Sequence, residues 1–170
     1  MKEILDICKE NKLILIEDCC ESLGAKYVAK KVGNFGIMGS FSLYFGHHIT
    51  SIEGGIIVTD NFEVYDLLKS ARSHGWVRDS PRKKLYPDFE NKDFLFDMLG
   101  YNLRSTNVNA AIGLVQLKKL DNSIKIRQNN HKYFLEKISK LNLGFQRVDL
   151  QETTSFSFAI LFENKIERNY

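Results

Sequence analysis

Cysteine and proline are both scarce in this chain of 170 residues. The three cysteines, Cys8, Cys19 and Cys20, show neither an even disulfide framework nor a CxxC metal spacing. Their pattern therefore argues against a disulfide-stapled fold and a structural zinc site. It favours a reducing, cytoplasmic setting.

Long apolar runs and a surplus of one charge are also missing. No apolar stretch approaches the roughly 18 residues of a membrane span, and residues 1–6 are amphipathic rather than a signal peptide. The 24 basic and 21 acidic residues are scattered, with a net charge of +3, and form no stripe of the kind that nucleic-acid binders carry. We predict a soluble protein whose partners are neither a membrane nor a nucleic acid.

The periodicity of the first 60 residues predicts an α/β fold. Apolar residues at helical spacing predict a helix over residues 2–11, and the run at 13–16 predicts a strand buried on both faces. Residues 40–45 and 56–59 predict two further strands.

The rest of the chain is mainly helical by pattern. A helix is predicted over residues 60–73 with Asp60 as its N-cap, and a second helical region, with one break, over 106–141. Residues 76–95 hold both prolines and predict a long connection, and 155–162 predict a last strand. These few strands are too few for a complete parallel sheet, so we predict that the chain is part of a longer fold.

Asp18 follows the first predicted strand directly, at the edge where open α/β sheets bind their ligands. A carboxylate in this position can keep a pyridine nitrogen protonated through a charge-assisted pair. A helix N-cap or a surface acid is the alternative interpretation. Glu21, one helical turn later, is placed to face the same cavity.

His47 and His48 lie in a polar, glycine-bearing bend after the strand at 40–45. Adjacent histidines can be a metal pair, a general base or surface residues. No cysteine or carboxylate lies near them at ligand spacing, so a metal is the least favoured of the three. A histidine pKa of about 6.5 suits proton transfer near neutral pH.

Two further groups suit oxyanions. The hydroxyls of Ser40 and Ser42 lie at a strand end, an arrangement that often holds phosphate. Asn102 and Arg104 offer an amide and a guanidinium just before a predicted helix. Each group alone is equally compatible with an ordinary loop.

Taken in order and spacing, five motifs over residues 10–140 resemble the DegT family of sugar-nucleotide aminotransferases. They are Ile16–Ala25, Gly33–Gly36, Phe41–His48, Glu53–Gly55 and Gly100–Arg104. The resemblance implies an α/β fold, namely part of the large domain of the pyridoxal-phosphate (PLP) transferases of fold type I, typified by aspartate aminotransferase. It assigns residues 1–145 to the C-terminal part of that large domain and 146–170 to the start of a truncated small domain.

The family's Schiff-base lysine lies six residues before Glu-Gly-Gly, and His47 takes its place here. Within the family this exchange resembles the 3-dehydratases, which remove a hydroxyl from a nucleotide-linked 4-keto-6-deoxy sugar. An imidazole cannot form the imine and can only move protons. The resemblance therefore implies non-covalent PLP or pyridoxamine phosphate (PMP), with His47 as the acid/base.

The resemblance also implies partners and contacts. Because no cysteine follows Cys20, it points to the dehydratases without an iron–sulfur cluster, which use glutamate as amino donor and supply deoxysugars for lipopolysaccharide O-antigen. It implies a homodimer with active sites formed across the two-fold axis. The implied cofactor contacts are Asp18 to the pyridine nitrogen, Glu21 (a glutamine in most of the family), Ser42 to the phosphate and Asn102 to the neighbouring subunit's phosphate; His48 and Arg104 are the implied substrate contacts.

Two alternatives remain open on the sequence alone. One is an ordinary PLP-dependent sugar aminotransferase. The other is an inactive remnant of the fold, because the family's upstream phosphate loop and most of its small domain have no counterpart between residues 1 and 170.

Overall fold

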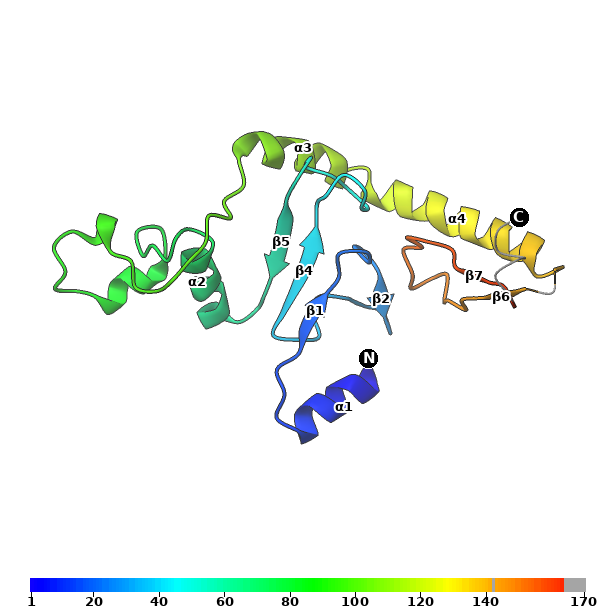
Figure 1. Ribbon diagram of the computed structural model, residues 1–170, viewed down its shortest axis with the longest axis horizontal. Coiled ribbons are helices and arrows are strands. Elements are labelled where there is room, and N and C mark those ends of the chain that lie inside the picture. The colour runs from blue at the N-terminus through cyan, green and yellow to red at the C-terminus, as the bar shows by residue number, and fades with distance from the viewer. Residues whose placement is uncertain (142, 164–170) are drawn as a thin grey trace.

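A three-stranded sheet forms the centre of the computed structural model, which describes residues 1–141 and 143–163 (Figure 1). Its strands are β1 (Ile16–Asp18), β4 (Met38–Ser42) and β5 (Gly55–Val58), in the order β1-β4-β5. β4 runs parallel to β1 and antiparallel to β5. The central strand β4 therefore brings its carboxyl end to the same edge of the sheet as the carboxyl end of β1.

The described residues form four α-helices: α1 (Lys2–Glu10), α2 (Phe62–Ala71), α3 (Asn107–Leu117) and α4 (Leu120–Ile138). The predicted helices are thus confirmed, including the break in the last region. In Figure 1, α3 lies across the end of the sheet where β4 connects to β5, and α4 continues from it beyond the sheet. Among the described residues, no helix is long and apolar enough to cross a membrane.

The N-caps explain where two helices begin. The Asn61 side chain accepts a hydrogen bond from the Val64 amide at 3.0 Å, so the predicted cap at Asp60 is wrong by one residue. Thr106 caps α3 by accepting from the amide of Asn109 at 3.2 Å. In both cases a short polar side chain satisfies a donor that the helix itself leaves free.

Two short hairpins complete the strands: β2 (Lys26–Tyr27) with β3 (Lys30–Lys31), which was not predicted, and β6 (Gly144–Phe145) with β7 (Ile160–Leu161), of which only β7 lies inside a predicted strand. The strand predicted over 155–162 is confirmed at Ile160–Leu161 and is wrong for 155–159 and 162, which lie outside any strand. The predicted domain boundary after residue 145 falls inside the second hairpin, and residues 164–170 of the predicted small domain lie outside the described residues. The division into domains stays a prediction.

The connection between α2 and α3 is irregular, as predicted, with two 3₁₀ turns, η1 (Pro81–Leu85) and η2 (Lys92–Phe94). A buried carboxylate, Asp97, holds it by accepting bonds from Arg82 Nε at 2.7 Å and from the Tyr86 hydroxyl at 3.2 Å. The bond to Asp97 raises the pKa of Arg82. The connection is therefore an ordered structure built around an ion pair.

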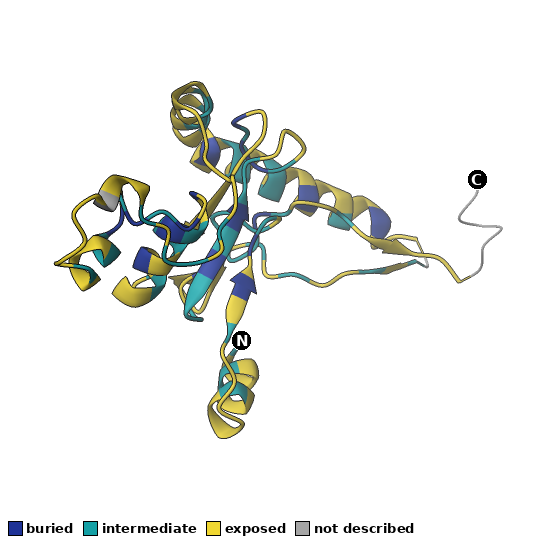
Figure 2. Cartoon of the chain, turned by 60° about the vertical axis from the view of Figure 1, so that its left-hand side comes forward, coloured by how far each residue is buried: buried dark blue, intermediate teal, exposed yellow. Residues whose placement is uncertain are grey.

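The core is small. The buried apolar residues are Cys19, Ala25, Phe41, Ile49, Val77, Leu120 and Ile138. Figure 2 shows buried segments along the middle of the sheet, on one side of α4 and around α2 with the chain that follows it. The predicted two-sided burial of residues 13–16 is wrong for this chain, because Leu13, Ile14 and Ile16 are 58%, 74% and 54% exposed. No described helix packs over that side of β1.

Candidate functional site

Asp18 ends β1, and the register of the sheet places it opposite Ser40 on β4. Its Oδ1 accepts a hydrogen bond from the Cys20 amide at 3.2 Å, and the Ser40 hydroxyl lies 3.5 Å away. Hydrogen bonds from Cys20 are the main cause of a lowered pKa at Asp18, and the charge of His47 contributes. Asp18 is therefore an exposed, ionised carboxylate at the carboxyl edge of the sheet.

The two cysteines beside Asp18 are poor nucleophiles. Burial raises the pKa of Cys19, and the hydrogen bond to Asp18 together with burial raises the pKa of Cys20. Both side chains therefore stay thiols at neutral pH. Among the residues that the structure describes, no three His, Cys, Asp or Glu side chains gather in a way that could hold a metal ion.

Glu17, one residue earlier, is buried and faces the opposite way. Its carboxylate accepts three backbone N–H bonds, from Gly33 at 2.7 Å, Phe35 at 2.5 Å and Gly36 at 2.7 Å. The loop at 33–36 is drawn against β4 so closely that a Cβ at Gly39 would lie 2.5 Å from the Gly33 Cα. Glu17 thus fixes the loop that joins β3 to β4 against the end of β1, and with it the place of Asp18.

Ser42 ends β4, where its hydroxyl accepts from the Tyr44 amide at 3.1 Å. The chain then turns, and the amide of His47 donates to the Tyr44 carbonyl at 3.0 Å. The His47 ring is half-buried and lies edge-on to Tyr44 with 5.8 Å between centroids. Its Nδ1 is buried and has no hydrogen-bond partner within the described part of the chain.

The His48 side chain packs into the interior. It is only 5% exposed, and its Nε2 lies 2.8 Å from the Thr154 hydroxyl. Burial lowers the pKa of His48 to about 4, with further contributions from Arg127 and His47. His48 is therefore neutral near pH 7, and its contact with a substrate stays a prediction.

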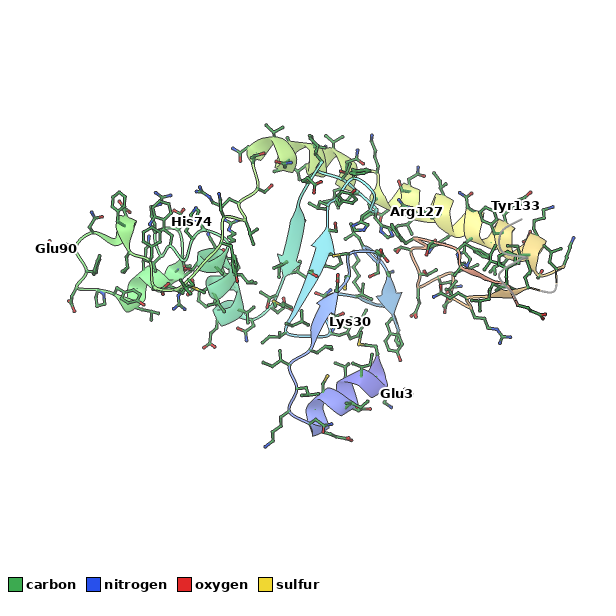
Figure 3. All side chains as sticks on the ribbon, viewed as in Figure 1. Glu3, Lys30, His74, Glu90, Arg127 and Tyr133 are labelled. Carbon is green, nitrogen blue, oxygen red and sulfur yellow. The ribbon has the colours of Figure 1, made fainter. Side chains whose placement is uncertain are left out.

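Residues 152–158, called the strap below, close the far side of this turn. Helix α4 holds the strap: Gln128 Nε2 donates to the Thr153 carbonyl at 2.8 Å, and His131 Nδ1 lies 2.5 Å from the Ser155 hydroxyl. Arg127, which Figure 3 shows on the side of α4 toward the β4–β5 connection, donates to the His48 carbonyl at 3.4 Å. The turn with the two histidines thus lies between α4 and the strap.

Three other predicted contacts, Glu21, Asn102 and Arg104, have no hydrogen bond to Asp18, Ser42 or His47 within the described residues. Glu21 is exposed just after β1. Asn102 pairs with Ser73 in an isolated antiparallel bridge, and Arg104 is exposed in the extended segment before α3. No contact given by the described residues joins Asn102 or Arg104 to Asp18 in one chain, and the prediction that they act on a neighbouring subunit stays untested.

The structure thus brings Asp18, Ser42 and His47 to one edge of the sheet, where the two parallel strands end. Sequence reasoning missed three contributors: Glu17, Thr154 and Phe156, whose ring centroid lies 5.6 Å from that of His47. Glu17 was visible only as part of a motif. Nothing local marks the other two, because their contacts join parts of the chain that are far apart in sequence.

This edge can be compared with known proteins. The sequence matches the DegT/DnrJ/EryC1/StrS aminotransferase family over residues 1–169. The chain belongs to this family. It is 39% identical over 166 residues to GDP-4-keto-6-deoxy-D-mannose 3-dehydratase of Escherichia coli O55:H7. The matched region covers 95% of this chain and 43% of the relative.

Solved structures agree with this assignment. E. coli GDP-4-keto-6-deoxy-D-mannose-3-dehydratase with bound hydrated PLP superimposes with a TM-score of 0.87 at 40% identity, over 96% of this chain and 43% of that chain. A second structure of such a dehydratase, with a trapped PLP-glutamate geminal diamine, gives a TM-score of 0.87 at 39% identity, over 96% and 44%. The predicted fold class is confirmed, and the chain spans less than half the length of these DegT-family relatives.

Proposed function

We propose that this chain is part of a PLP/PMP-dependent 3-dehydratase acting on a nucleotide-linked 4-keto-6-deoxy sugar. The observation that carries the proposal is His47 at the family's lysine position, on the same sheet edge as Asp18 and Ser42. The similarity to GDP-4-keto-6-deoxy-D-mannose 3-dehydratase supports a GDP-linked sugar as substrate.

The residues at the edge fit a pyridine-based cofactor. Asp18 is ionised and exposed, as a partner for a protonated ring nitrogen must be, and it is held at one oxygen by the Cys20 amide. Asp18 would hold the ring nitrogen, Ser42 the phosphate and Glu21 the ring. When bound, the cofactor supplies an electron sink for the bond cleavage.

His47 is proposed as the group that moves the proton. The Nδ1 of its half-buried ring is shielded from solvent and has no hydrogen-bond partner within the described residues. The Tyr44 ring packs against it in an edge-to-face contact. Histidine carries protons efficiently near neutral pH, whereas it cannot replace lysine in a covalent link. Non-covalent cofactor binding follows from this exchange.

The remaining assignments form part of the same proposal. A homodimer would bring Asn102 to the neighbouring subunit's cofactor phosphate and Arg104 to the substrate, and His48 would line the substrate side of the turn. The similarity to a dehydratase structure with a trapped PLP-glutamate adduct supports glutamate as amino donor. The three free cysteines support a cytoplasmic location, and O-antigen deoxysugar synthesis is the proposed role.

One assay separates the possible functions. A full-length protein carrying this sequence is incubated with GDP-4-keto-6-deoxymannose, PLP and glutamate, and the products are identified by mass spectrometry. We expect a 3-deoxy sugar and 2-oxoglutarate. A 4-amino sugar would instead identify an aminotransferase, and the absence of both products would identify an inactive remnant.

Variants at the two histidines test the assignment of His47. We expect H47N to abolish dehydration and borohydride to fix no cofactor to the parent protein. H47K is expected to restore a reducible covalent link, whereas H48K, the matched control one residue on, is expected to restore none. Near-parental dehydration by H47N would refute the role of His47.

A further inference from the structure

The strap places an aromatic ring against both histidines of the site. The ring centroid of Phe156 lies 5.6 Å from that of His47, with the planes at 68°, and 5.5 Å from that of His48, at 30°. Such edge-to-face and tilted contacts are favourable geometries for aromatic pairs. The Phe156 ring therefore packs against both histidine rings.

The strap is tied down immediately before this ring. Thr154 meets His48 at 2.8 Å and Ser155 meets His131 at 2.5 Å, while the Glu152 carbonyl accepts from the Lys26 amide at 2.8 Å. These bonds reach the turn, helix α4 and the β2–β3 hairpin. Phe156 is thus presented by a backbone that three separate elements hold.

Ser155 adds backbone strain at the decisive position. Its φ is +51°, in the left-handed region that residues other than glycine rarely adopt. Such strain persists only where the surroundings impose it, and it gathers at functional sites. Here the hydrogen bonds of Thr154 and Ser155 impose the turn from which Phe156 follows.

The His47 ring has few other restraints. Its Nδ1 has no hydrogen-bond partner within the described part of the chain, so ring contacts with Tyr44 and Phe156 define its orientation. We propose that Phe156 is a positioning residue that holds the His47 imidazole in its working orientation. This inference rests on the proposed acid/base role of His47.

Kinetics of a matched set of variants test the proposal in the full-length protein. F156L removes the ring that touches His47. F158L removes a ring from the same strap that touches His131 and Phe134 instead. We expect F156L to lower kcat about tenfold with KM changed less than about twofold, because a misoriented proton carrier slows the step without weakening binding. F156Y is expected to recover most of the loss, and F158L to stay within about twofold of the parent.

A second readout needs neither cofactor nor substrate. Diethylpyrocarbonate modifies accessible neutral imidazoles, and peptide mass spectrometry reports each histidine separately. We expect His47 to be modified several-fold faster in F156L than in the parent, and at the parental rate in F158L and F156Y. Unchanged His47 reactivity and kcat in a folded F156L protein would overturn the inference. Equal losses of kcat in F156L and F158L would overturn it too, because the strap as a whole would then be responsible.

Failure here is distinguishable from failure of the proposed function. If H47N keeps its dehydration activity, the proposed function fails whatever Phe156 does. If H47N is inactive while F156L behaves like the parent in both readouts, only the positioning role of Phe156 fails.

Discussion

Glu17 binds three backbone amides with one buried carboxylate, while its neighbour Asp18 faces solvent. Hydrogen bonds to a charged group contribute about 1.5–3 kcal/mol each, and an amide side chain would turn its own N–H groups toward some of these donors. We expect E17Q to lower the free energy of unfolding by about 2–4 kcal/mol. Urea unfolding followed by circular dichroism measures this change.

Glu21 supplies the matched control for that substitution. It is an exposed glutamate four residues later, so E21Q should change the free energy of unfolding by less than about 0.5 kcal/mol. Equal effects of the two variants would contradict the role assigned to Glu17.

The neutral, buried state of His48 makes stability depend on pH. Its pKa in the folded protein is about 4, below the ordinary 6.5, so between these values the unfolded chain binds the proton and the folded chain does not. Stability should therefore fall as pH drops from about 6.5 toward 4, by up to about 3 kcal/mol at about 1.4 kcal/mol per pKa unit. Burial also lowers the pKa of His131, which acts in the same direction.

Urea midpoints at pH 7.5, 6.5 and 5.5 measure this dependence. The comparison is between the parent and H48Q, which cannot titrate in this range. We expect a shallower fall in the midpoint for H48Q than for the parent. Identical slopes would show that the acid sensitivity arises elsewhere.

At the scale of a single helix, the start of α2 distinguishes two adjacent polar residues. Asn61 caps the helix, whereas Asp60 is exposed just outside it. We expect N61A to cost about 1 kcal/mol of unfolding free energy, because the Val64 amide loses its acceptor. D60A is expected to cost about half of that or less, and thermal melts of the two variants side by side test the order.

Periodicity predicted the long elements well and the short ones poorly. The helices and β4 and β5 follow patterns of several residues, but β2, β3 and β6 have two residues each and leave no periodic signal, and of the strand predicted over 155–162 only the two residues of β7 formed. The site divides in the same way. Asp18, Ser42 and His47 lie in motifs close together in sequence, whereas Phe156 reaches His47 only because α4 carries the chain away and the strap returns it.

The strand at 13–16 failed for a different reason. Its apolar run is typical of a strand covered by other elements on both faces. The run predicts this burial whether or not the covering elements belong to residues 1–170. The exposure of Ile14 follows from the missing cover, whereas the pairing with Met38–Ser40 sets the bounds of β1 at Ile16–Asp18.

The whole molecule exposes far more surface than its mass explains. A folded monomer of 19.6 kDa has about 8,600 Å² of accessible surface, and this chain has 12642 Å². Large apolar side chains account for part of the excess, among them Leu99, Ile14 and Val28 at 96%, 74% and 74% exposed. Large apolar side chains exposed in such number are normally covered by other protein.

We therefore expect residues 1–170, produced alone, to associate. Light scattering after size exclusion should give a mass above 19.6 kDa at micromolar concentration, and the dye ANS should fluoresce strongly. L114E, on an exposed position of α3, should reduce association more than K118E at the end of the same helix. A monodisperse monomer that leaves the dye dark would contradict this expectation.

The mixed sheet has one more consequence, which concerns the addition of further strands at its edges. Over the described residues β4 is paired on both sides, so β1 and β5 are outer strands whose far backbone groups form a template for another strand. β5 continues an antiparallel pair, which a simple hairpin can extend, whereas a strand parallel to β1 needs a long crossover. With Ile56 and Ile57 about half exposed, at 47% and 49%, we expect β5 rather than β1 to be the edge onto which a further strand pairs.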